Sequence, residues 1–171
     1  MLTHGPRTCL AAGVTAVLVV VGFAPSSTAA EAVRVSGSGA PAADDECVTD
    51  QGYGEANAPA GVPPLSFDEG DLIGCYYVDT ADTRVTATGG GRYRLVEQGT
   101  ETFIGTFDGD PVTFRTSYVF LAWFLGDPSD GGTQLSGGCH HPLIEGGTGA
   151  LHFTDDVENG LIRYRGVINL S

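Results

Sequence analysis

Residues 111–125 read Pro-Val-Thr-Phe-Arg-Thr-Ser-Tyr-Val-Phe-Leu-Ala-Trp-Phe-Leu. Successive side chains of a β-strand point to opposite faces, so alternation in such a stretch shows which face is interior. The even positions form a nearly apolar stripe: Val112, Phe114, Thr116, Tyr118, Phe120, Ala122 and Phe124. The pattern predicts a long strand whose even face is buried.

Similar stretches recur between glycine-rich turns over the last hundred residues. They predict strands at about 72–86, 92–107, 111–125, 133–145, 149–155 and 160–170. Long strands joined by short turns favour an antiparallel meander, and closure of the meander removes its exposed edges. The fold predicted for residues 72–171 is therefore an all-β, antiparallel closed β-barrel of about eight strands, with a β-sandwich as the alternative.

The N-terminus has the pattern of a signal peptide over residues 1–30. Arg7 precedes an uncharged apolar run, Leu10–Ala24, which is followed by small residues up to Ala30. The run is shorter than the roughly 20 residues that a membrane-spanning helix needs. We expect a secreted, extracellular protein with no stable membrane insertion after cleavage, the alternative being an uncleaved anchor.

Residues 31–71 have the composition of a flexible acidic segment. They are rich in Asp, Glu and Pro, and their only aromatic residues are Tyr53 and Phe67. Such a segment buries too little apolar surface to offset the entropy of ordering it. If Cys47 forms a disulfide, however, the nearby chain is pinned, and residues 62–67 then lie against the barrel.

The charge balance excludes one class of partner. The chain has 8 basic residues, all arginine, against 21 acidic ones, for a net charge of −13. Such a chain repels a phosphate backbone, so we expect no nucleic-acid partner. The cysteines and histidines lack the spacing of a metal site, and we expect neither a metal nor a cofactor.

Three cysteines follow the expected cleavage site: Cys47, Cys75 and Cys139. An oxidising compartment predicts one disulfide and one unpaired thiol. We favour Cys75–Cys139. Each of these cysteines lies on the face of its predicted strand that carries the apolar residues, and the bond would join two strands. Pairing of Cys47 with either of the other two remains the alternative.

Carboxylates share faces with aromatic residues in two of the predicted strands. In 92–107 the odd face carries Glu97 and Glu101 beside Tyr93 and Phe103, unless a bulge near Gly99 turns at least one glutamate outward. In 72–86 the odd face, which we take as interior, carries Tyr77 and Asp79 opposite Tyr76. A carboxylate among rings is paired, raised in pKa, or located where water reaches it.

His140 and His141 are adjacent in a predicted strand, so they point to opposite faces and cannot bind one metal together. The parity of Cys139 and Leu143 places His141 inside. It is interpreted as a neutral, hydrogen-bonded interior histidine, with a catalytic base as the alternative. His152 is expected to face solvent.

Five segments carry a resemblance to a known family. They are Leu-Ile-Gly-Cys-Tyr-Tyr-Val-Asp (72–79), Glu-Gln-Gly-Thr-Glu-Thr-Phe-Ile-Gly (97–105), Gly-Gly-Cys-His-His-Pro-Leu-Ile (137–144), Gly-Thr-Gly-Ala-Leu-His-Phe-Thr-Asp-Asp-Val-Glu-Asn-Gly (147–160) and Tyr-Arg-Gly (164–166). The module resembles small secreted bacterial proteins that are similar to the allene oxide cyclase and dirigent barrels. The resemblance implies an eight-stranded barrel with a central apolar cavity, in which the former enzymes isomerise a fatty-acid epoxide and the latter steer phenoxy-type coupling. The glycine-rich stretch 146–150 is shorter here than in that family.

Three functions follow as hypotheses. In the first, a small apolar molecule binds in the barrel against aromatic side chains, namely Tyr77, Tyr93, Phe103, Phe114, Tyr118 and Phe120. In the second, the protein is an isomerase or cyclase of allene oxide cyclase-like type with Glu97, Asp79 and His141 as catalytic candidates. In the third, the barrel is filled and the protein has a non-catalytic role at the cell surface.

Overall fold

The computed structural model describes residues 31–43, 46–47 and 62–170. These residues form eight strands: β1 (Val33–Pro41), β2 (Leu65–Gly70), β3 (Leu72–Gly89), β4 (Arg92–Phe107), β5 (Asp110–Leu125), β6 (Thr133–Glu145), β7 (Gly147–Asp156) and β8 (Leu161–Leu170). A single 3-10 turn, η1 (Pro128–Asp130), interrupts the connection from β5 to β6. The predicted signal peptide, residues 1–30, lies outside the described residues.

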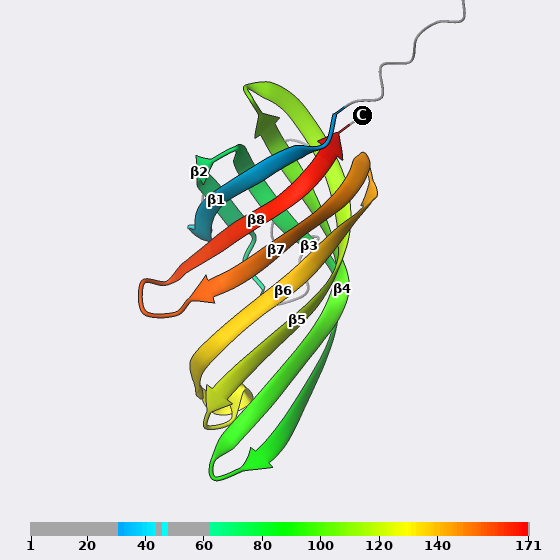
Figure 1. Cartoon of the computed structure of the whole chain (residues 1–171). Helices are drawn as coiled ribbons and strands as arrows, with labels where there is room; N and C mark the ends of the chain where they lie inside the picture. The colour runs from blue at the N-terminus through cyan, green and yellow to red at the C-terminus, as the bar shows by residue number, and fades with distance from the viewer. Residues whose placement is uncertain (1–30, 44–45, 48–61, 171) are drawn as a thin grey trace, which may run out of the picture.

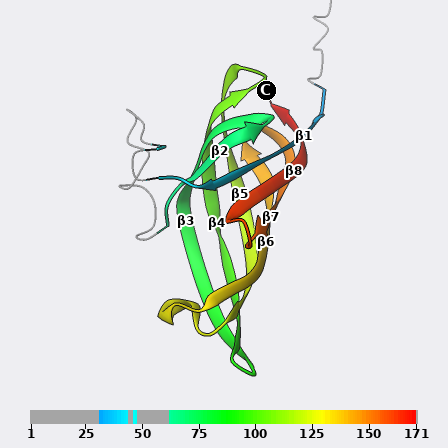
Figure 2. The same ribbon diagram turned by 90° about the vertical axis from the view of Figure 1, so that its left-hand side faces the viewer.

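Every strand pairs antiparallel with its neighbours in the chain, and β1 also pairs with β8, so the sheet closes into a ring (Figure 1). The long strands β3, β4 and β5 extend well beyond the short β1 and β2 (Figure 2). The prediction of an all-β antiparallel fold is confirmed. In the described part of the chain no helix is long and apolar enough to cross a membrane.

The alternation in the sequence predicts the interior correctly on several strands. On β5, Phe114, Thr116, Tyr118 and Ala122 are all buried. On β4 the pairing with β5 runs without a register shift, so Glu97 and Glu101 share the inward face, and the bulge considered near Gly99 is absent from this strand pair. The extra residue lies in the partner strand β3, between Val78 and Thr80, and is Asp79.

Two expectations about the first part of the fold are wrong. The composition of residues 31–71 predicts a flexible segment, but β1 and β2 lie within this range and complete the ring between β3 and β8, while residues 44–45 and 48–61 lie outside the described residues. Composition misleads here because these strands bury few side chains, chiefly Val35 and Phe67, while their backbones pair on both sides. The conditional expectation that residues 62–67 lie against the barrel agrees with the burial of Phe67.

The inward face of β3 was also assigned incorrectly. Leu72, Tyr76 and Val78 are buried, whereas Ile73 on the opposite parity is 42% exposed. Tyr77 is buried as well, but on the outside of the ring, where its hydroxyl donates a hydrogen bond to the carbonyl oxygen of Cys47 at 2.8 Å. Both parities are therefore apolar in this part of β3, and alternation alone cannot tell them apart.

The disulfide joins Cys47 to Cys75, and Cys139 is a free thiol. The preferred pairing of Cys75 with Cys139 is thus wrong. The two side chains lie on opposite sides of the sheet. Cys75 points outward toward the segment at Cys47, whereas Cys139 points into the interior from β6, which is not a neighbour of β3.

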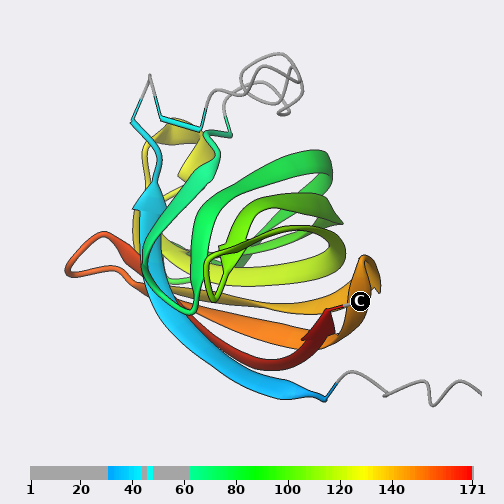
Figure 3. The same ribbon diagram turned by 90° about the horizontal axis from the view of Figure 1, so that it is seen from above.

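One half of the interior is closely filled. Ten buried residues form this packed core: Val35, Phe67, Leu72, Tyr76, Phe103, Phe114, Leu151, Phe153, Tyr164 and Ile168. The rings of Phe103 and Phe114 stack with centroids 4.9 Å apart, and Phe67 meets Tyr76 and Tyr164 edge to face. The view from above shows how the strands curve around the interior of the ring (Figure 3). The other half of the interior is hollow.

Candidate ligand-binding cavity

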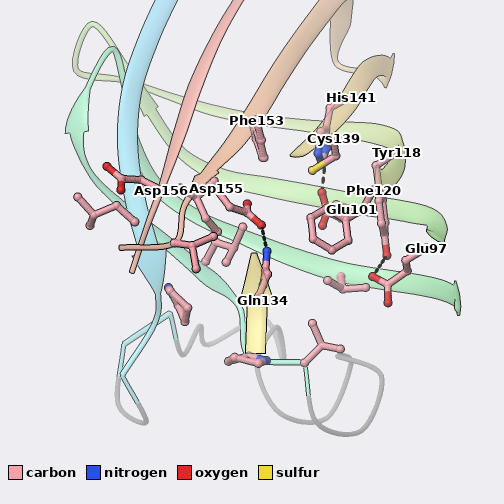
Figure 4. A pocket seen from close by; sticks show the side chains of 18 of the residues that line it. Glu97, Glu101, Tyr118, Phe120, Gln134, Cys139, His141, Phe153, Asp155 and Asp156 are labelled. Carbon is pink, nitrogen blue, oxygen red and sulfur yellow. Dashed lines mark hydrogen bonds and ion pairs between the residues drawn. The ribbon is translucent and has the colours of Figure 1, made fainter. Parts of the chain in front are cut away.

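A cavity of about 370 Å³ lies inside the ring, at the end where the turn between β7 and β8 is found. Its walls come from the inward faces of β4 to β7, and its rim includes Pro41, Val62, Pro63, Leu65 and the β7–β8 turn. The side chains that project into it are shown in Figure 4. The apolar part of the lining includes Val78, Phe120, Phe153, Leu161 and Ile162. A cavity of this size and composition is suited to a small organic molecule.

His141 is held in the wall between two aromatic rings. It stacks on Phe153 with centroids 4.1 Å apart and on Tyr118 with centroids 5.6 Å apart. Its Nδ1 lies 3.0 Å from Oε2 of Glu101 and 3.4 Å from Oγ1 of Thr116. The His141 and Glu101 side chains are only 1% and 8% exposed. Stacking on both faces fixes the plane of the imidazole, so this buried pair has a defined orientation.

The pair retains unused hydrogen-bonding capacity. Among the described residues, neither Oε2 of Glu101 nor Nε2 of His141 has a hydrogen-bond partner, although the first lies 3.0 Å from Nδ1 of His141. Buried polar atoms are almost always hydrogen-bonded in folded proteins. Polar groups left in this state beside a cavity are suited to contact with a ligand that enters it.

Glu97 lies farther along the same face of β4 and is hydrogen-bonded. It accepts a hydrogen bond from the Tyr118 hydroxyl at 2.8 Å and another from Oγ1 of Thr83 at 2.6 Å. Burial raises the pKa of Tyr118, and the hydrogen bond to Glu97 and the charge of that carboxylate raise it further. Tyr118 therefore remains a hydrogen-bond donor and holds the Glu97 carboxylate in place.

The carboxylates of Asp155 and Asp156 both border the cavity but differ in environment. Burial raises the pKa of Asp155, although the hydrogen bond that Gln134 donates to it acts in the opposite direction. Asp156 accepts a hydrogen bond from Arg163 Nη2 at 2.8 Å and others from Asn159, and these bonds lower the pKa of Asp156. For Asp155 the hydrogen bond from Gln134 does not fully offset the cost of burying the charged carboxylate, whereas Asp156 is part of a surface ion pair.

The free thiol of Cys139 also lines the cavity. Burial raises its pKa, and the negative charges of Glu101, Asp155 and Glu97 add to the effect. The group therefore stays a thiol at neutral pH, and a thiol is a poor nucleophile compared with a thiolate.

Of the residues predicted as a site, Glu97, His141, Tyr118 and Phe120 come together at the cavity. Asp79 does not, because it lies in a network on the outside of the ring, 3.3 Å from Nε of Arg115 and accepting a hydrogen bond from Thr102. The other predicted aromatic contacts lie elsewhere: Tyr77 under the Cys47 segment, Tyr93 half-buried outside the cavity, and Phe103 and Phe114 in the packed core.

Several lining residues were not predicted as site residues, namely Glu101, Gln134, Cys139 and Asp155. A signal for Asp155 exists in the sequence, since extending the apolar parity of Leu151 and Phe153 by two residues reaches it. For Val62, Pro63 and Leu65 the sequence offers only the conditional expectation that this segment lies against the barrel, and their position at the rim follows from the pairing of β2 with β3. Within the described ranges, no group of three or more His, Cys, Asp or Glu side chains could hold a metal ion.

Comparisons of this chain with protein-family models, with curated proteins and with solved structures gave no match.

Proposed function

We propose that this protein is a secreted barrel protein that binds a small apolar ligand in the cavity between β4 and β7. The observation that carries the proposal is the cavity of about 370 Å³, with apolar walls and two buried polar atoms that lack hydrogen-bond partners in the described structure. A side-chain-filled interior would leave no such volume. The resemblance to allene oxide cyclase and dirigent barrels supports the same interpretation, because it also implies a central cavity.

Secretion is supported by the apolar N-terminal run and by the disulfide. A Cys47–Cys75 bond persists in an oxidising compartment and is rare in the cytosol. Both features agree with export of the chain.

Binding is tested with N-phenyl-1-naphthylamine, a fluorophore that is uncharged at neutral pH and brightens in apolar surroundings. We expect saturable binding to the purified protein and at least tenfold weaker binding to Cys139→Phe, whose ring would occupy the cavity. Val119→Phe is the matched control, because Val119 is 54% exposed on the outer face of β5. No saturable binding, or equal binding by the Cys139→Phe protein with an unchanged circular dichroism spectrum, would contradict the proposal.

A second candidate is an isomerase or cyclase, and the buried Glu101–His141 pair favours it. A carboxylate and an imidazole 3.0 Å apart beside a cavity could take a proton from one carbon of a bound substrate and return it to another. Asp79 and Tyr77 have no part in this candidate, because both lie outside the cavity. Conversion of an unsaturated or epoxide substrate that is lost in Glu101→Gln and kept in Asp110→Asn would support it.

A further inference from the structure

The charges that surround the cavity are almost all negative. Glu97, Glu101 and Asp155 point into it (Figure 4), and neither arginine nor lysine is among its lining residues. The whole chain has no lysine, and Arg163, the arginine beside the rim, is bonded to Asp156. His141 is the one lining side chain in the described structure that can become a cation, and it faces Glu101.

The buried atoms of the Glu101–His141 pair show where a ligand group would be bound. Oε2 of Glu101 lies 3.0 Å from Nδ1 of His141 but forms no hydrogen bond of normal geometry among the described residues, although the side chain is more than nine-tenths buried. Such a buried carboxylate oxygen retains hydrogen-bonding capacity, and a charged donor from a ligand would satisfy it most effectively. The other nitrogen of the His141 imidazole, Nε2, is also buried and has no hydrogen-bond partner among the described residues.

The remaining walls are apolar and aromatic. Val78, Phe120 and Ile162 can accommodate a hydrocarbon body, and the ring of Phe120 can also face a cation. By contrast, a ligand with its own carboxylate would lie close to the carboxylates of Glu97, Glu101 and Asp155, and like charges repel one another more strongly inside a protein than in water.

We propose that the ligand of this cavity is a small amphiphile with an apolar body and a protonated amine, and that Glu101 binds the ammonium group. This inference rests on the proposed ligand-binding function and narrows it. It selects cationic over anionic molecules, so that a free fatty acid is a poor ligand. The role of Glu97 is secondary, because Tyr118 and Thr83 already donate to its carboxylate.

The test uses three compounds of nearly equal size: 2-naphthylethylamine, 2-naphthylethanol and 2-naphthylacetate. Calorimetric titration of the purified protein at neutral pH measures their affinities. We expect the amine to bind at least tenfold more tightly than the alcohol, and the acetate to bind more weakly than the alcohol. Glu101→Gln should reduce the affinity for the amine to that for the alcohol and change the affinity for the alcohol by less than twofold.

Asp110→Asn is the matched control, because it removes one negative charge from an exposed position outside the cavity. It should leave all three affinities unchanged. If Glu101→Gln does not fold, as judged by circular dichroism, Asp155→Asn serves as the second variant and should weaken the amine selectively.

The outcomes separate the inference from the function on which it rests. Binding of the alcohol with equal or tighter binding of the acetate than the amine would overturn the inference and leave the proposed function standing. Loss of amine selectivity in Asp110→Asn would also overturn it, because the preference would then reflect total charge. Failure of all three compounds to bind would overturn both.

Discussion

The two halves of the ring interior are built by the same strands but differ in their side chains. In the packed half, β4 and β5 turn Phe103 and Phe114 inward, and the two rings stack. In the hollow half, the same faces of β4 and β5 carry Glu97, Glu101 and Tyr118. Alternation along a strand decides which residues face inward, and the identity of those residues decides whether the interior is filled or hollow.

Carboxylates with polar partners distinguish the hollow half from the packed half. Burying an ionised carboxylate against apolar atoms is very unfavourable unless it is paired or hydrated. Glu97, Glu101 and Asp155 each have such a partner, in Tyr118, His141 and Gln134 respectively. The hollow half therefore presents polar groups where the packed half presents stacked rings.

The largest expected effect is on the free energy of unfolding, when one phenylalanine in each half of the interior is replaced by alanine. Phe103 is fully buried, so Phe103→Ala should lower the free energy of unfolding by about 3–5 kcal/mol. Phe120 is only half-buried beside the cavity, and Phe120→Ala should cost less than half as much. Urea unfolding followed by circular dichroism measures both. Equal losses would mean that the two halves are equally packed.

The disulfide provides the next largest effect and connects the outer surface to the cavity. Cys47 and Cys75 are 28 residues apart in sequence, and the chain-entropy treatment gives roughly 3–4 kcal/mol for a loop of this length. The loop contains residues 62–65, which form part of the rim. The double variant Cys47→Ala/Cys75→Ala should lose about this stability and also bind the naphthyl fluorophore more weakly.

Cys139→Ala is the control for that variant, because it removes a cysteine and leaves the disulfide in place. Thermal unfolding under oxidising conditions compares the three proteins. A midpoint for the double variant equal to that of Cys139→Ala would show that the disulfide does not stabilise the ring.

Much of the ring can be predicted from alternation, and the exceptions have physical causes. On β5 the even parity is almost wholly apolar, and on β8 Arg163 and Arg165 mark the outer face. The inward positions of Phe114, Tyr118, Tyr164 and Ile168 therefore follow from the sequence and agree with their burial, even though the outer parity of β5 also ends in apolar residues. On β3 both Tyr76 and Tyr77 are buried, one by the packed core and one by the distant Cys47 segment. The periodicity of β3 cannot show that a segment distant in sequence, at Cys47, buries Tyr77 on the outer face.

The candidate site is less predictable than the fold because it depends on contacts across the ring. The parity of β6 correctly places His141 inside, whereas the bulge considered near Gly99 left the direction of Glu97 open in the sequence. The sequence does not show that His141 pairs with Glu101, since β6 and β4 are separated by β5. Nor does it show which end of the interior is hollow, because that depends on the volumes of side chains from all eight strands.

The smallest expected effect concerns two neighbours at the border of the cavity, Asp155 and Asp156, whose pKa values shift in opposite directions. Burial raises the pKa of Asp155 in the folded state, so its contribution to stability is present below the unfolded pKa and is lost as the pH rises through the folded value. The Arg163 bond lowers the pKa of Asp156, so its contribution is present above the unfolded pKa and is lost as the pH falls through the folded value.

Asp155→Asn and Asp156→Asn each remove one negative charge, so effects of total charge cancel between them. Relative to the unmodified protein, Asp155→Asn should gain stability as the pH rises from about 3 to about 7, whereas Asp156→Asn should lose stability over the same range. Melting temperatures of the three proteins across this range measure the two slopes. Slopes of the same sign would show that Asp155 is as well solvated as a surface carboxylate, and that water reaches this part of the cavity wall freely.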